Sequence, residues 1–173
     1  NYEVFFAEAK EIPNVLHEIG RLREITFREV GEGTNESIDI DSFDQYYRHL
    51  FLWDGDAKKI AGAYRMGLGS EIYPKYGVEG LYLYDLFRFE PELYEMLHHS
   101  IEMGRAFIVK EYQQKPMPLF LLWKGIIHIT LHHPEHKFLL GGVSISNQFS
   151  DFSKSLMIEF MKSNFYDPYI AQY

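Results

Sequence analysis

The stretch Ser100–Gly125, SIEMGRAFIVKEYQQKPMPLFLLWKG, combines three different local patterns. Its first part is a short apolar run typical of a β-strand, interrupted by the charged residues Glu102 and Arg105. A turn-rich connection follows, and Pro118 then begins an apolar run to Leu131 that predicts a helix with proline at its first position. Because a strand, a short loop and a helix N-terminus form a natural site for an anion, this stretch indicates a place for a charged ligand.

The composition is that of a folded, acidic protein. The chain has 173 residues, of which 46% are hydrophobic, and this length suits one domain with its own core. With 17 basic against 25 acidic residues, it lacks the positive field of a nucleic-acid-binding protein. The absence of cysteine excludes disulfides and thiolate chemistry. We therefore expect a single domain over residues 1–173 and no nucleic-acid partner.

Hydropathy and the chain start indicate a cytoplasmic protein that is a piece of a longer chain. No run approaches the roughly 18 apolar residues that a membrane-spanning helix needs, and the N-terminus lacks a signal-peptide pattern. The first residue is Asn1 and not methionine, which suggests a fragment. The aromatic content of 17% suits a surface or tunnel that contacts an apolar ligand, and it equally suits a tyrosine-rich core.

Hydrophobic periodicity predicts about six strands interspersed with helices. Runs typical of strands occupy residues 2–7, 50–53, 60–66, 81–87, 100–109 and 138–145. Helical spacing predicts helices over residues 12–30, 91–99, 119–131 and 150–165, with a shorter one near 71–76. The turn Asp54-Gly55-Asp56 joins the second and third strands as a hairpin. This alternation favours one α/β domain with a mixed sheet flanked by helices.

Four motifs, in this order, resemble a branch of the GNAT-like acyltransferase superfamily. They are Leu22-Arg23 with Phe27, Asp41-Ser42-Phe43-Asp44, Gly62-Ala63-Tyr64-Arg65, and Glu102-Met103-Gly104-Arg105. The branch contains the N-acyl homoserine lactone synthases and the ornithine- and glycine-lipid N-acyltransferases, also labelled hemolysin-like. The resemblance spans nearly the whole chain. It implies transfer of an acyl group from a carrier thioester, usually on acyl carrier protein, to the amine of an amino acid or similar small acceptor.

The resemblance also implies a fold and a place for the acyl donor. In a GNAT-like fold the central sheet is mixed and mostly antiparallel, and its fourth strand, here 100–109, splays from the fifth, here 138–145. The pantetheine arm lies in the gap along backbone groups of the fourth strand, which here are those of Phe107, Ile108 and Val109. The charges of Lys110 and Lys115 predict attraction of the arm's phosphate or of an acidic carrier protein, and Trp123 lies in the helix that could wall an acyl tunnel.

The connection before the helix departs from the pattern of enzymes that use coenzyme A. Those enzymes share a glycine-rich segment whose backbone N–H groups hold a pyrophosphate. This chain has Pro116 and Pro118 in that segment, and proline has no N–H to donate. A carrier protein presents a single phosphate and needs fewer donors. We therefore expect acyl carrier protein as the donor, with acyl-coenzyme A as the alternative co-substrate and no permanently bound cofactor.

Glu102 and Arg105 are the candidate catalytic residues. An amine attacks a thioester only when it is neutral, so the site needs a proton acceptor, and Glu102 is suited to this role directly or through water. Side chains three apart on a regular strand point to opposite faces, but a bulge at Gly104 would bring them to one side, with Arg105 orienting the site. The simpler alternative is an ion pair between these two residues at a strand edge.

A second group of charged residues is implied to shape the acceptor site. In the homoserine lactone synthases the positions matching Arg23, Asp41, Asp44 and Arg65 form a charged cluster beside the acceptor pocket. Bidentate arginine–carboxylate pairs would fix its geometry. The alternative is a set of ordinary surface acids that contribute little to stability, and we interpret the neighbouring Asp39 as solvated.

The apolar helix and the histidines each have a structural explanation. The run that begins at Pro118 is interpreted as a core helix, with the wall of an acyl tunnel as the alternative. His128 and His132 share a helix face, but no acidic third ligand is set among the histidines as a zincin-type motif requires, and Pro134 ends the helix. Histidines near a helix C-terminus interact favourably with its dipole, so we predict no metal site.

These residues predict an N-acyltransferase that moves a fatty acyl group from acyl carrier protein to a small amine, an amino acid destined for a lipid. Such a role is compatible with contact at the inner face of the membrane. The resemblance also implies a tyrosine that protonates the departing thiolate, and Tyr166 and Tyr169 lie in a suitable region. Three alternatives are an acetyl-coenzyme A-dependent N-acetyltransferase, a non-catalytic module that binds carrier protein or membrane, and an acyl homoserine lactone synthase.

Overall fold

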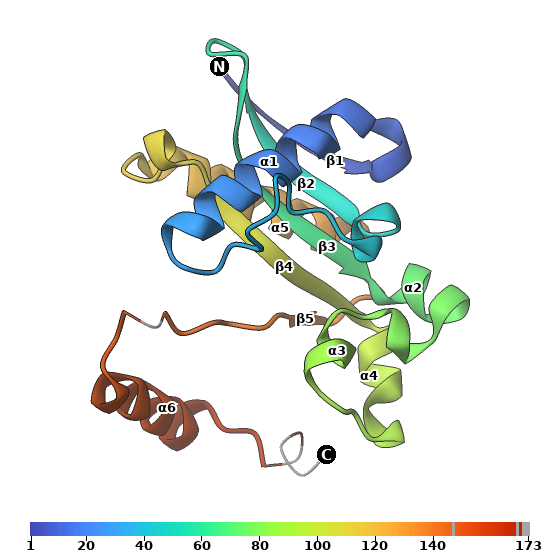
Figure 1. Cartoon of the computed structure of the whole chain (residues 1–173). Helices are drawn as coiled ribbons and strands as arrows, with labels where there is room; N and C mark the ends of the chain where they lie inside the picture. The colour runs from blue at the N-terminus through green and yellow to red at the C-terminus, as the bar shows by residue number, and fades with distance from the viewer. Residues whose placement is uncertain (147, 169, 171–173) are drawn as a thin grey trace.

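The computed structural model, which describes residues 1–146, 148–168 and 170, contains a five-stranded sheet between helices (Figure 1). The strands are β1 (Tyr2–Glu8), β2 (Arg48–Asp54), β3 (Lys59–Leu68), β4 (Ser100–Ile108) and β5 (Phe138–Leu140). They lie in the order β1-β2-β3-β4-β5, antiparallel up to β4, while β5 runs parallel to β4. The mixed, mostly antiparallel sheet of the predicted fold is confirmed.

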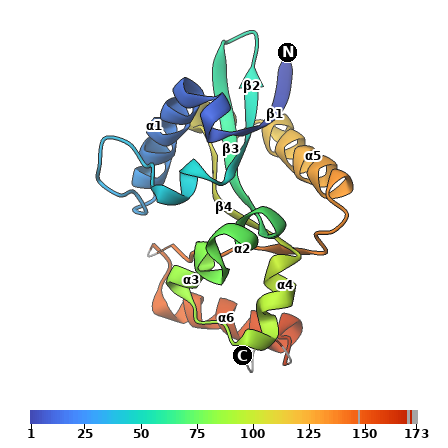
Figure 2. The same cartoon turned by 90° about the vertical axis from the view of Figure 1, so that its right-hand side faces the viewer.

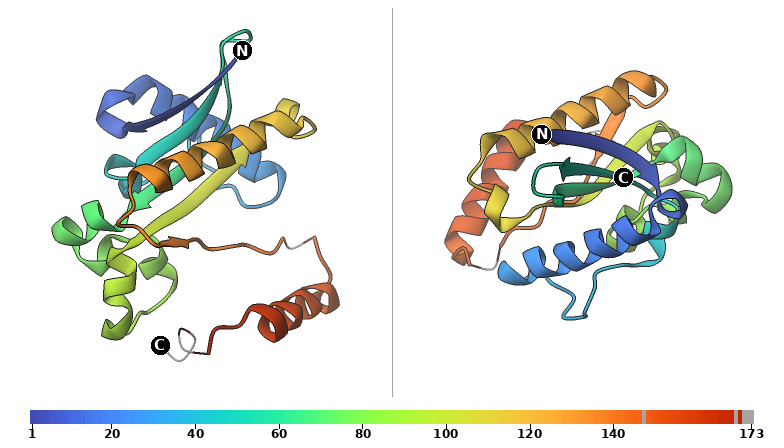
Figure 3. Two further views of the ribbon diagram at one scale, coloured as in Figure 1. Left: turned by 180° about the vertical axis from the view of Figure 1, so that it is seen from behind. Right: turned by 90° about the horizontal axis from the view of Figure 1, so that it is seen from above.

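Helices cover both faces of the sheet. They are α1 (Pro13–Glu29), α2 (Gly69–Tyr76), α3 (Leu83–Leu86), α4 (Tyr94–His98), α5 (Pro116–His132) and α6 (Asp151–Phe165). Figure 2 and the right-hand view of Figure 3 show α1 on one face and α5 on the other. The short helices α2, α3 and α4 gather at one end of the sheet (Figure 2), and α6 lies beyond β5 (Figure 1).

The alternation of side chains along β2 explains why both faces are covered. Leu50 and Leu52 belong to the buried cluster that includes Leu122 and Ile126 of α5. Phe51, between them, belongs to a second cluster with Ile19 of α1. Because successive residues of a strand point to opposite faces, an unbroken apolar run needs a partner on each side, and the two long helices provide these partners.

The strand predicted over residues 81–87 is wrong. Leu81 follows a 3-10 turn at Val78–Gly80, and the next residues form α3. The N–H groups of Tyr82 and Leu83 donate to the carboxylate of Glu102 and not to a neighbouring strand. The apolar side chains of this segment pack in a cluster with Tyr47, Ile72 and Leu97, and the sheet has five strands.

The divergence of β4 and β5 is present, although β5 is shorter than predicted. The two strands pair only where Ser100–Glu102 meets Phe138–Leu140. Gly141 then brings its backbone against the carbonyl oxygen of Met103, where a side chain would not fit. The chain continues to residue 145 without strand pairing, so among the described residues no strand lies beside the edge of β4 beyond Glu102 that faces β5.

The last two long helices present apolar side chains to solvent. Leu122, Ile126 and Ile129 are buried on one face of α5, so the interpretation of this run as a core helix is confirmed for that face. On the other face, Phe120 is 61% exposed. The helix begins at Pro116 and not at Pro118. No residue of α6 is buried. Within the described part of the chain, no helix has both the length and the hydropathy to span a bilayer.

Candidate active site

A bulge in β4 sets the geometry of the site. Pairing between β3 and β4 shifts so that Arg105 and Ala106 together lie opposite Tyr64. Arg105 adopts φ +50°, a left-handed conformation that is unfavourable for a residue with a side chain. The predicted bulge is therefore present, one residue beyond Gly104.

The bulge brings Glu102 and Arg105 to the same neighbour and not to each other. The N–H of Tyr82 donates to Glu102 at 3.1 Å, and the Arg105 guanidinium lies 5.6 Å from the centre of the Tyr82 ring. The alternative of a Glu102–Arg105 ion pair is wrong, since Glu102 is bonded to Tyr47, Tyr82 and Leu83. Arg105 instead lies near Asp39 and Asp41.

Glu102 is a buried carboxylate held by three donors. The Tyr47 hydroxyl donates to Oε2 at 2.6 Å, Tyr82 N–H donates to the same oxygen, and Leu83 N–H donates to Oε1 at 2.9 Å. Burial raises the pKa of Glu102 above its ordinary value of 4.5, although these hydrogen bonds oppose the shift. A carboxylate has about four acceptor positions, so Oε1 keeps one for a water or a substrate amine.

Tyr47 is a site residue that the sequence interpretation missed. It is 2% exposed, and its hydroxyl accepts from Tyr82 N–H at 2.9 Å while donating to Glu102. Burial and the negative charge of Glu102 raise the pKa of Tyr47, so the hydroxyl stays protonated. Of the two tyrosines that were predicted, Tyr166 is exposed beyond α6 and Tyr169 lies outside the described residues.

The charged cluster implied by the resemblance is present and deeply buried. Arg23 donates to both oxygens of Asp44 at 3.0 and 2.7 Å, and Arg65 donates to Asp41 at 2.6 Å. Burial alone would raise the pKa of Asp44, but the hydrogen bond from Arg23 and the charges of Arg23 and Arg65 lower it to about 2. These four residues are not surface acids and arginines, because only Asp41 has appreciable exposure.

Asp39 was interpreted as solvated, and this was wrong. Its side chain is 2% exposed, and its Oδ2 lies 3.2 Å from Arg23 Nε. The same oxygen is 3.9 Å from Arg105 Nε. No periodic pattern indicates this burial, because Asp39 lies in a loop whose position depends on the helix that carries Arg23.

Aromatic rings connect the charged cluster to Glu102. The Arg65 guanidinium lies 5.5 Å from the Phe43 ring centre, 5.2 Å from that of Tyr47 and 5.3 Å from that of Tyr82. Rings accept a cation over their faces and exclude water from it. Tyr47 and Tyr82 thus contact both the carboxylate and the arginines of the site.

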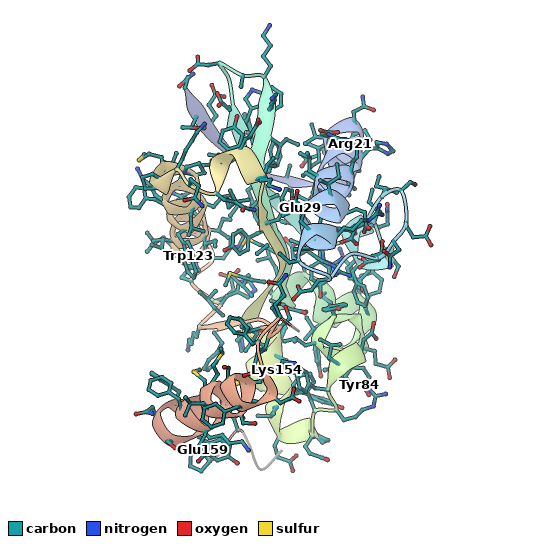
Figure 4. The ribbon with its side chains drawn as sticks, turned by 60° about the vertical axis from the view of Figure 1, so that its left-hand side comes forward. Arg21, Glu29, Tyr84, Trp123, Lys154 and Glu159 are labelled. Carbon is teal, nitrogen blue, oxygen red and sulfur yellow. The ribbon has the colours of Figure 1, made fainter. Side chains whose placement is uncertain are left out.

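The predicted donor-binding residues do not converge as a group. Phe107 packs in the core on the α1 side, and Val109 N–H donates to Ala61 oxygen at 3.0 Å, so it is not free to bind a ligand. Trp123 lies on the exposed side of α5, away from the gap between β4 and β5 (Figure 4).

The remaining predicted donor residues have contacts of their own. Ile108 packs against the cluster on the α5 side, and its carbonyl oxygen accepts from Gln113 at 2.9 Å. Lys110 is paired with Glu29 at 2.9 Å, and Lys115 lies over the Tyr112 ring at 4.5 Å. Only the two lysines remain on the surface and accessible to an anion.

An open pocket that the sequence did not indicate lies between the segment that follows α1 and the segment that follows β5. Its volume is about 420 Å³. The lining residues follow α1 and β5, and they are Val30, Gly31, Glu32, Ser144, Ile145 and Gln148. Figure 1 shows the chain after β5 running away from β4 toward the same side as the end of α1.

Two histidines and a glutamate lie close together just before the start of β5. Glu135 Oε1 lies 3.3 Å from His133 Nδ1 and 3.4 Å from His136 Nδ1, so an acidic neighbour exists that the sequence interpretation did not expect. The Ser70 N–H donates to His136 Nε2, which leaves the proton of a neutral ring on Nδ1, facing Glu135. This Nδ1 has no hydrogen-bond partner among the described residues. The three side chains lie close enough together to be candidate metal ligands, and the absence of a metal site stays a prediction.

Comparison with known proteins places this architecture in a family. A model of the acetyltransferase (GNAT) domain matches residues 22–123, a range that contains every residue of the charged cluster, Glu102 and Arg105. The chain belongs to the GNAT family. Among its GNAT relatives is a protein named glycine N(alpha)-acyltransferase from Bacteroides thetaiotaomicron, 33% identical over 96% of this chain. A protein of the same name from Phocaeicola vulgatus is 33% identical over 95% of the chain.

The GNAT chain spans about half the length of these curated relatives, 53% and 54% respectively. Solved structures show the same fold at low identity. The acyl-homoserine lactone synthase LasI aligns over 92% of this chain and 77% of its own, with a TM-score of 0.54 and 14% identity. The coenzyme A-dependent acyl-homoserine lactone synthase BjaI aligns over 78% and 63%, with a TM-score of 0.55 and 16% identity.

Proposed function

We propose that this GNAT protein is an N-acyltransferase that moves a fatty acyl group from acyl carrier protein to the amine of a small amino acid. The observation that carries the proposal is Glu102, a buried carboxylate with a raised pKa and a free acceptor position, set beside an arginine–aspartate cluster. The names of the two relatives supply the reaction class, and the product would be an N-acyl amino acid of the kind that aminolipids contain.

In the proposed reaction a neutral amine nitrogen attacks the thioester carbonyl carbon. The C–N bond forms and the C–S bond breaks, one N–H proton passes to Glu102 directly or through water, and the departing thiolate sulfur takes up a proton. A general base helps most when its pKa lies near the working pH, and the burial of Glu102 moves its pKa in that direction.

The free edge of β4 is the proposed track for the pantetheine arm, because the strand has unpaired backbone groups where β5 diverges. The pocket beside it would receive part of the donor. Pro116 and Pro118 occupy the first and third positions of α5, so this helix end offers fewer N–H groups to a pyrophosphate than an ordinary helix does. This favours a donor with a single phosphate over coenzyme A.

The test is an assay of the protein with glycine and three donors: long-chain acyl-acyl carrier protein, long-chain acyl-coenzyme A and acetyl-coenzyme A. The product is measured by mass spectrometry. We expect N-acylglycine from the carrier-protein donor at the highest kcat/KM. Turnover of acetyl-coenzyme A alone would replace the proposal with an N-acetyltransferase, and the absence of product from every donor would favour a non-catalytic binding module.

A further inference from the structure

We propose that Arg105 binds the carboxylate of the acceptor, so that the acceptor is an α-amino acid and not a simple amine. The inference rests on the proposed function and adds to it a residue that recognises the substrate. It comes from a difference among the three arginines of the site, from the backbone that carries Arg105, and from the space beside it.

The first observation is that the Arg105 guanidinium donates no hydrogen bond to any of the residues that the structure describes. Arg23 and Arg65 each donate to a carboxylate at 2.6 to 3.0 Å. Arg105 lies 3.9 Å from Asp39 and 3.8 Å from Asp41, and neither contact is a hydrogen bond. Its Nε is buried and has no hydrogen-bond partner among the described residues; the same holds for Arg23 Nε, but Arg23 keeps its two bonds to Asp44. Buried donors are nearly always paired in folded proteins. The unpaired N–H groups of the Arg105 guanidinium are therefore available to bind a ligand.

The second observation is the strained backbone. Arg105 sits in the left-handed region at the bulge, where glycine would be favoured. Strain of this kind persists where the side chain it presents has a use. The conformation directs the side chain toward Asp39, Asp41 and Tyr82 and keeps it 24% exposed, so a ligand can reach it.

The third observation is open space beside Gly104, the residue before Arg105. A side chain built on Gly104 would meet no atom within 4 Å. Gly104 does not need its conformational freedom, since it is not among the glycines with positive φ. The structure thus leaves open space at the residue next to Arg105, on the strand that carries it.

The charges around Arg105 suit a zwitterion better than a simple anion. Asp39 and Asp41 would repel a phosphate dianion, but they would attract the ammonium group of an amino acid whose carboxylate is on Arg105. Tyr82 joins the two ends, because its ring contacts Arg105 and its N–H contacts Glu102. An α-amino acid held in this way would present its amine toward the base.

The experiment compares glycine with glycinamide, which keeps the amine and lacks the carboxylate. The variants are Arg105→Gln and Arg105→Gly, and the matched control is Arg21→Gln, an exposed arginine paired with Glu18 on α1. We expect kcat/KM for glycine to fall about 10- to 100-fold in both Arg105 variants, as the loss of hydrogen bonds between charged groups requires, and glycinamide to be little changed. Each comparison is between variants on one acceptor, so the different basicities of the two amines cancel.

Equal losses on both acceptors would overturn the proposal, as would an unchanged preference for glycine. A raised KM for the acyl donor with unchanged acceptor preference would assign Arg105 to the donor phosphate. Arg105→Gly is included because glycine tolerates the left-handed conformation, so the fold is retained. If the wild-type protein turns over neither acceptor, the proposed function fails. Glycine binding followed by NMR then decides: binding lost in Arg105→Gly and kept in Arg21→Gln supports the inference, and equal or absent binding overturns it.

Discussion

The Tyr47 hydroxyl donates a 2.6 Å hydrogen bond to Glu102 across 55 positions of sequence, and both residues are 2% exposed. Tyr47 directly precedes β2, whereas Glu102 lies near the start of β4. The two strands are not neighbours, since β3 lies between them. This bond therefore connects the segment before β2 to the strand that carries the proposed base. Both partners also contact Tyr82.

Glu102→Gln should lower kcat by about 100- to 10,000-fold, the usual contribution of a general base, without unfolding the protein. In the wild type the pKa of Glu102 is raised, so kcat/KM should fall on acidification at a pH above the ordinary 4.5, and this limb should vanish in the variant. Rates measured from pH 5 to 9 check the prediction. The exposed Glu36→Gln is the control, and an unchanged rate in Glu102→Gln would remove Glu102 from the mechanism.

Tyr47→Phe should move the acidic limb of that profile to higher pH. The Tyr47 hydrogen bond stabilises the charged form of Glu102 and so lowers its pKa, and its loss leaves burial less opposed. Removal of a buried hydroxyl that serves two partners should also cost about 1–3 kcal/mol of stability. Carbon-13 NMR of the labelled carboxyl group measures the pKa without an activity assay. Tyr76→Phe, on an exposed tyrosine, should leave the titration where it is.

The sequence predicted the site where the residues belong to short motifs and failed where distant segments meet. The motif residues Arg23, Asp41, Asp44 and Arg65 do form one cluster. Tyr47 and Tyr82 are two of 13 tyrosines, and nothing local separates them from the rest. Their roles arise because the segment after α2 folds back onto β4, which is a property of the tertiary structure.

The same limit applies to the fold. Strands and long helices that bury one or two faces were predicted within a few residues, because their periodicity is a direct consequence of burial. The segment 81–87 is apolar but does not pair with a strand of the sheet. Its N–H groups donate to Glu102, whereas those of a strand would donate to a neighbouring strand. An apolar run alone does not distinguish these two arrangements.

Asp44 should make the free energy of unfolding of the protein decrease at acidic pH. Its pKa is about 2 in the folded state against an ordinary 3.8, so its contribution is present above about pH 4 and is lost as the pH falls toward 2. The difference corresponds to about 2 kcal/mol. Urea unfolding at pH 5 and pH 2.5 measures it.

Asp44→Asn isolates this contribution. The variant should be less stable at neutral pH by about 3–5 kcal/mol, because it leaves Arg23 buried with a weakened partner, and its stability should fall less between pH 5 and pH 2.5 than that of the wild type. Asp85→Asn, at an exposed position, is the control. An equal pH dependence in Asp44→Asn and the wild type would show that the acid sensitivity comes from other groups.

Arg105→Gly should separate stability from activity. Glycine adopts the left-handed conformation at φ +50° without the steric cost that arginine meets, and it loses more entropy on folding, so the two effects nearly cancel. We expect the free energy of unfolding to be unchanged or raised by up to about 1 kcal/mol, while acyl transfer to glycine is impaired. Ala106→Gly, on the other residue of the bulge, has no positive φ to relieve and should lose about 0.5–1 kcal/mol. Urea unfolding of both variants checks the sign. A loss of stability in Arg105→Gly larger than that in Ala106→Gly would mean that the Arg105 side chain is held for packing, whereas the expected order means that the protein tolerates a strained residue in order to keep a free guanidinium at its acceptor site.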